Sequence, residues 1–198
     1  MVEFVKNILD GIKLRGMLFV LVLFVIVLAM NIWQYQKQKE KYASSFRKYL
    51  KCERKNVLTS FMVLYIGVIY MLTLVTRGQE PVRDLKGMVP FWSWRAAPAD
   101  FGAENTECIL EQIIFNILVF IPIGWLLFIL EKMKPLQALA VGAMISLPIE
   151  ILQLIFRLGL FEWDDMMHNA LGCLFGALLG SAFYKMVKVS KRQKEGIE

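Results

Sequence analysis

The segment "SLPIEILQLIFRLGLFEWDDMMHNALGCLFGALLG", residues 146–180, is apolar enough for a lipid bilayer but contains several charged and amide side chains. These are Glu150, Gln153, Arg157, Glu162, Asp164, Asp165, His168 and Asn169. A charged side chain inside a bilayer is costly, so it is expected to face the protein interior and to mark a functional site. We therefore interpret the segment as the end of one helix, an external turn and the start of the next helix.

The rest of the chain is also built from long apolar blocks. Of its 198 residues, 57% are hydrophobic, and they form continuous runs where a soluble domain would show short alternating ones. A helix of about 20 apolar residues crosses a hydrocarbon layer of about 30 Å. We therefore predict an all-α, polytopic membrane protein, a single membrane domain over residues 1–198. Its five predicted transmembrane helices are about 16–35, 57–75, 111–130, 136–156 and 166–186.

The net charge of +6 is concentrated in the linkers between the apolar blocks. Basic linkers beside an anionic leaflet explain this charge better than a nucleic-acid-binding surface does. Of the 23 Lys and Arg residues, fifteen lie in the linker 36–56, the turn 131–135 and the tail that begins at Lys185. The positive-inside rule then predicts an external N-terminus and a cytoplasmic C-terminus.

The sequence predicts neither a metal site nor a cofactor. Cys52, Cys108 and Cys173 lie in different segments without metal-ligand spacing, so we expect free thiols. The acidic residues around Asp164 are not enough to predict a Mg²⁺ or Ca²⁺ site, since a short acidic turn is common on protein surfaces.

Residues 76–110 form the largest external segment in this orientation. The segment is rich in Pro and Gly, and it holds Phe91, Trp92 and Trp94 around Pro90. Such aromatic side chains anchor a loop among lipid headgroups. A loop above a polar site also serves to cover a ligand. The sequence leaves both roles open.

Two helical faces carry the polar side chains of the opening segment. Glu150, Gln153 and Arg157 have the i, i+3, i+7 spacing of one helical face. Asp165 and Asn169 share a face of the following span by the same arithmetic. The two faces are expected to lie near the external boundary of the membrane.

The third predicted span adds Asn116 at a matching depth, one turn after Gln112. The last span also contains a doubled Gly-x-x-x-Gly motif over residues 172–180, on the face of Asn169. Glycines at this spacing let a neighbouring helix approach closely. Polar residues distant in sequence are therefore predicted to converge on one layer that faces the outer leaflet.

Two roles are open for this layer. One is a structural clasp, in which Glu150 pairs with Arg157 or hydrogen-bonds to Asn116. The other is a binding or catalytic pocket, in which Arg157 would hold an anionic headgroup and Glu150 and Asp165 would act as acid, base or cation ligands. His168, the only histidine, lies one residue off the Asp165 face and is expected at the membrane interface.

Three motifs together resemble the VanZ-like family of bacterial membrane proteins. "NILVFIPIGWLL", "SLPIEILQLIF" and "FEWDDMMHNALGCLFGALLG" are similar to its Asn-x-x-x-Phe-x-Pro-x-Gly, Ser-x-x-Ile-Glu-x-x-Gln and Asp-x-x-x-Asn-x-x-Gly-x-x-x-Gly helices. The matching residues are Asn116, Phe120, Pro122, Gly124, Ser146, Ile149, Glu150, Gln153, Asp165, Asn169, Gly172 and Gly176. The external "GMVPFWSW" is similar to an Asn-Leu-Ile-Pro-Phe loop of the family at Pro90 and Phe91, and the resemblance covers about residues 60–185.

Three positions depart from the family pattern. Gly87 replaces the loop Asn, and Glu162 replaces the first Asp of the acidic turn. The family's Arg aligns near Gly159, two residues after Arg157. A shift of two residues turns a side chain by about 200° around a helix.

The resemblance implies a bacterial plasma-membrane protein of the cell envelope, linked to low-level glycopeptide resistance, to teicoplanin more than to vancomycin. The leading hypothesis is a polar pocket facing outside that binds an anionic lipid-linked ligand of the outer leaflet, or the lipidated antibiotic itself. The pocket residues would be Pro90, Phe91, Asn116, Glu150, Gln153, Arg157, Asp164, Asp165 and Asn169. The alternative is a membrane enzyme acting on a lipid phosphate or lipid-linked cell-wall precursor, with Glu150 or Asp165 as acid or base. A small transporter is disfavoured because no internal repeat is visible.

Overall fold

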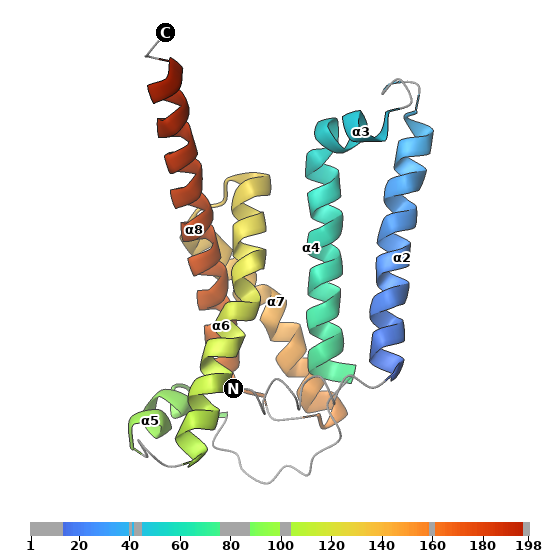
Figure 1. Cartoon of the computed structure of the whole chain (residues 1–198). Helices are drawn as coiled ribbons and strands as arrows, with labels where there is room; N and C mark the ends of the chain where they lie inside the picture. The colour runs from blue at the N-terminus through green and yellow to red at the C-terminus, as the bar shows by residue number, and fades with distance from the viewer. Residues whose placement is uncertain are drawn as a thin grey trace. The chain divides into compact units, whose positions relative to one another are not determined.

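A computed structural model describes residues 14–39, 41, 45–75, 88–99, 104–158 and 161–195 (Figure 1). All regular secondary structure in these ranges is helical, which confirms the predicted all-α fold. Four helices are long and apolar enough to cross a membrane. They run over Arg54–Leu74, Ile109–Glu131, Pro135–Phe156 and Trp163–Ser190. The polytopic membrane class follows from their length and composition.

The first predicted span coincides with α2 (Leu14–Lys37). Within α2, the part whose side chains the structure describes, Leu21–Lys37, is apolar. The membrane-crossing role of this fifth helix stays a prediction.

Contacts divide the chain into two compact units, residues 1–78 and 79–198. Besides α2, the first unit contains α3 (Phe46–Cys52), α4 (Arg54–Tyr70) and a π-helical turn, η1 (Met71–Val75). The fully buried Tyr49 joins α3 to α2, because its ring packs against Tyr35 and its hydroxyl donates a hydrogen bond to Gln34 at 3.2 Å. Part of the predicted basic linker is therefore an ordered helix.

The second unit contains α5 (Trp92–Ala99), α6 (Glu104–Glu131), α7 (Pro135–Phe156) and α8 (Trp163–Glu195). α6 and α8 run side by side in the same direction, α7 runs in the opposite direction and packs mainly against α8, and α5 lies beside the start of α6 (Figure 1). The predicted external segment 76–110 is thus partly helical, since α5 and the first turns of α6 fall inside it. The stretches 76–87 and 100–103 lie outside the described residues.

Glycines hold α6 and α8 together. A Cβ atom on Gly172 would overlap the carbonyl oxygen of Ile117, and one on Gly176 would overlap that of Ile121. Gly124 of α6 faces the backbone of α8 in the same way. The backbones of the two helices are therefore in direct contact, as the doubled Gly-x-x-x-Gly motif predicts.

We predict that Gly176→Ala destabilises the protein, because the new methyl group meets backbone that cannot rotate away. Overpacking of this kind costs about 1–3 kcal/mol, and thermal unfolding of the purified protein would show a lower melting temperature. Gly180→Ala is the matched control, since its Cβ would meet only the Phe128 side chain, 3.0 Å away. Equal melting temperatures for both variants would contradict the proposed packing.

Candidate functional site

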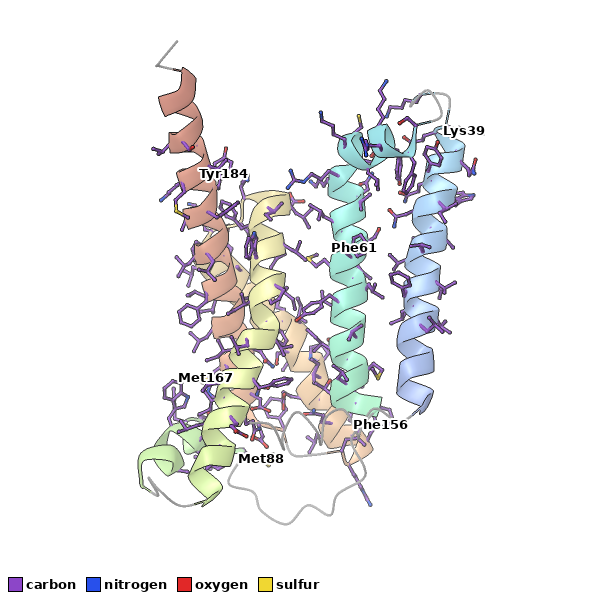
Figure 2. All side chains as sticks on the ribbon, in the orientation of Figure 1. Lys39, Phe61, Met88, Phe156, Met167 and Tyr184 are labelled. Atoms are coloured by element: carbon purple, nitrogen blue, oxygen red, sulfur yellow. The ribbon has the colours of Figure 1, made fainter. Side chains whose placement is uncertain are left out.

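Buried polar side chains gather at one end of the second unit, where α5, the start of α6, the end of α7 and the start of α8 meet (Figure 1). Figure 2 marks this end by Met88 and Met167 and the opposite end by Tyr184. We call the set the polar layer. It comprises the buried Ser93 of α5, Ser146, Glu150 and Gln153 of α7, and Asp164, Asp165, His168 and Asn169 of α8, together with the half-buried Gln112 and Asn116 of α6.

Asp165 ties α8 to α6. Its carboxylate accepts a hydrogen bond of 2.7 Å from the Asn116 amide and longer ones, 3.3 and 3.4 Å, from the Gln112 amide. Both amides reach the same carboxylate because they are one turn apart on α6. The predicted meeting of the third and fifth spans is thus made by amide donors and one carboxylate acceptor.

α7 is tied to α8 at two levels. The Asn169 amide donates to the Ser146 hydroxyl at 2.8 Å, and both side chains are buried. Near the α7–α8 turn, the Glu150 carboxylate accepts the backbone N–H of Glu162 at 3.0 Å. Glu162 directly precedes the first residue of α8, so its N–H lacks an acceptor within that helix. Glu150, which is 2% exposed, therefore fixes the start of α8.

Asp164 holds α5. Its carboxylate accepts the backbone N–H groups of Phe91 and Ser93, at 2.5 and 2.8 Å, and the Ser93 hydroxyl at 2.5 Å. These backbone groups belong to the start of α5, so Asp164 caps a helix that has no acidic residue in its own first turn. The sequence analysis assigned Asp164 to the external acidic turn, whereas in the structure it belongs to the first turn of α8 and its side chain is 1% exposed.

His168 is buried, whereas the sequence predicted an interfacial position. Its imidazole is 1% exposed and lies against Trp94, with 5.6 Å between the ring centroids. Neither ring nitrogen has a hydrogen-bond partner among the residues that the structure describes. His168 follows Asp164 by one turn, so both side chains face α5. The sequence analysis did not predict that Asp164 and His168 share a helical face, because it considered only the face of α8 that carries Asp165.

Arg157 does not share the buried face of Glu150 and Gln153. α7 ends at Phe156, and Arg157 is its exposed C-cap with a φ of 55°, in the left-handed region. The helical spacing that grouped the three residues therefore breaks off before Arg157. A left-handed C-cap is a common way to end a helix, although glycine is the usual residue there.

Of the remaining predicted site residues, some belong to the polar layer and others are exposed to the surroundings. Asn116, Glu150, Gln153, Asp165 and Asn169 all belong to the polar layer. Pro90 and Phe91 are exposed, and Phe91 takes part through its backbone N–H. Ser93 was not predicted, since a serine among tryptophans carries no spacing signal. Within the described ranges, no group of three or more His, Cys, Asp or Glu side chains is arranged to hold a metal ion.

We predict that Asp164→Asn releases α5. An amide offers one acceptor oxygen, and its NH₂ group would face a backbone donor, so the hydrogen bonds to Phe91 and Ser93 cannot all form. Hydrogen exchange of the amides at 91–95 should become at least tenfold faster. Asp165→Asn is the control, since Asp165 bonds to α6 and its loss should leave α5 protected. Unchanged exchange in Asp164→Asn would show that other contacts hold α5.

Comparison with protein-family models places most of the second unit within a known family. A family model described as VanZ/LLP1 matches residues 61–184. The matched range contains the whole of α5, α6 and α7 and the part of α8 that holds its polar-layer residues. No curated protein and no solved structure matches the chain.

Proposed function

The chain belongs to the VanZ/LLP1 family, and from this membership we propose that it is a cell-envelope protein that contributes to low-level glycopeptide resistance of the teicoplanin type. We propose that it acts by binding a lipid-linked cell-wall precursor or the lipidated antibiotic at the polar layer. The binding end would face the outer leaflet of a bacterial plasma membrane.

Exposed apolar side chains next to the polar layer support the proposal that the ligand is amphiphilic. Met88, Val89, Phe91 and Trp94 are large apolar side chains that stay exposed at the start of α5. Exposed apolar groups beside buried polar ones suit a molecule with an acyl chain and a polar headgroup. The acyl chain would lie along α5 and the headgroup would reach the layer.

The observation that carries the proposal is the burial of three carboxylates at this one end. Glu150, Asp164 and Asp165 are 2%, 1% and 7% exposed. Carboxylates accept hydrogen bonds, so they favour a headgroup rich in donors, such as peptide amides, amines and sugar hydroxyls. Arg157, the predicted anchor for an anionic headgroup, is exposed at the α7 C-cap. The geometry therefore favours the donor-rich part of a precursor or glycopeptide over a phosphate.

We predict that Glu150→Gln and Asp165→Asn each weaken teicoplanin binding about tenfold, equivalent to about 1.4 kcal/mol. Each change keeps the side-chain shape and removes one charged acceptor. Binding would be measured by titrating labelled teicoplanin onto the full chain in nanodiscs, with vancomycin, which lacks the acyl chain, as the weaker ligand. Resistance of cells carrying each variant would be measured in parallel.

Glu131→Gln is the matched control, because Glu131 is an exposed carboxylate at the far end of α6. It should bind teicoplanin as the wild type does. Wild-type affinity in both layer variants, with normal melting temperatures, would contradict binding at the polar layer.

An enzyme remains the second candidate, and the position of the buried His168 one turn after the buried Asp164 on α8 favours it. A buried imidazole one turn from a carboxylate is a common acid–base arrangement. The purified protein would then convert a lipid-linked precursor, and His168→Gln would abolish turnover. If no product forms during prolonged incubation with that precursor, the enzyme hypothesis is excluded.

The proposed orientation predicts opposite labelling of two cysteines. A membrane-impermeant maleimide should reach Cys108, near the start of α6, in intact cells. Cys52 is exposed at the end of α3 and should react only after the membrane is permeabilised. Cys173 is fully buried and should not interfere. The reverse labelling pattern would place the polar layer in the cytoplasmic half of the membrane.

A further inference from the structure

His168 is the only histidine of the chain, and its burial leaves two polar atoms unsatisfied. Buried polar atoms in folded proteins nearly always have a hydrogen-bond partner, and an exception calls for a functional reason or a bound partner. An apolar ring would fill the same space without losing hydrogen bonds to water. The imidazole therefore has hydrogen-bonding capacity that no protein group in the described residues uses.

α5 covers the imidazole. Trp94 packs on the His168 ring, and the bonds from Phe91 and Ser93 to Asp164 hold α5 in place. Asp164 and His168 lie one turn apart on α8, so the carboxylate that fixes α5 is next to the imidazole that α5 covers. Release of those bonds would expose both groups together.

The exposed groups would suit a sugar. A neutral imidazole has one donor and one acceptor, which a hydroxyl group complements on both sides. Within the described ranges the Asp164 Oδ1 atom accepts the Phe91 N–H alone, and a carboxylate oxygen can accept a second donor. Trp94 is 47% exposed and offers the flat apolar face on which a sugar ring can pack.

We propose that Trp94, Asp164 and His168 form a sugar-binding site between α5 and α8, which receives the glycan part of the ligand. The inference rests on the proposed function and names the part of the ligand that is recognised. Binding includes movement of α5 away from α8, because neither ring nitrogen reaches the surface while α5 is in place. Neighbouring sugar hydroxyls then bond to the imidazole and to the carboxylate.

Chemical modification of the single histidine tests the site directly. Diethyl pyrocarbonate would be applied to the full chain, carrying a histidine-free tag, and the modified His168 would be quantified by mass spectrometry. Octyl galactoside, below its micelle concentration, should slow the modification at least threefold. Octyl phosphocholine, which has no sugar, should leave the rate unchanged. Ser93→Ala should raise the rate several-fold, since it removes one of the bonds that hold α5.

Two substitutions of His168 distinguish a ligand-binding role of this residue from a purely structural one. His168→Phe removes the unsatisfied nitrogens, so its melting temperature should equal or exceed that of the wild type. Its affinity for teicoplanin should nevertheless fall at least tenfold. His168→Gln keeps a donor and an acceptor and should retain most of the affinity. A structural role alone would leave the affinity of a well-folded His168→Phe protein unchanged.

The failures of the two proposals are distinguishable. If wild-type protein binds teicoplanin but octyl galactoside gives no protection, or if His168→Phe binds as the wild type does, the sugar site is wrong and the proposed function stands. If wild-type protein does not bind teicoplanin, the proposed function is wrong, and protection by octyl galactoside decides the sugar site by itself. Should His168→Phe fail to fold, the protection experiment on wild-type protein decides whether the sugar site exists.

Discussion

The direct backbone contact between α6 and α8 determines the geometry of the second unit. Gly124, Gly172 and Gly176 leave no room for side chains at this contact, so the two helices meet in a single register. That register sets Asp165 opposite Asn116 and brings the first turn of α8 to the level of α5. The polar layer is thus positioned by glycines that take no part in its chemistry.

Hydrogen bonds to other parts of the unit then satisfy the buried carboxyl groups. Each of Glu150, Asp164 and Asp165 accepts a donor from a different part of the unit, namely the α7–α8 turn, α5 and α6. Such bonds offset much of the cost of removing a carboxylate from water. The structural clasp and the binding site considered for this layer are therefore compatible. The carboxylates hold the helices together.

Apolar block length and helical spacing were sufficient to predict the all-α membrane class. They also selected Asn116 and Asp165, which the structure joins by a hydrogen bond between α6 and α8. Three features of the site could not be predicted from block length and helical spacing. Helical spacing assumes that the helix continues, so it could not show that α7 stops before Arg157. The burial of His168 and the role of Ser93 depend on where α5 docks, which is set by long-range hydrogen bonds and not by local pattern.

The hydrogen bonds that hold α5 also impose an order on biosynthesis. The donors on Phe91 and Ser93 precede their acceptor on Asp164 by more than seventy residues of sequence. The first amides of α5 are synthesised well before α8, and Asp164 can accept them only once α8 has entered the membrane. A nascent chain that ends before residue 164 contains α6 and α7 but no acceptor for α5. Maturation of this end of the protein thus coincides with insertion of the last helix.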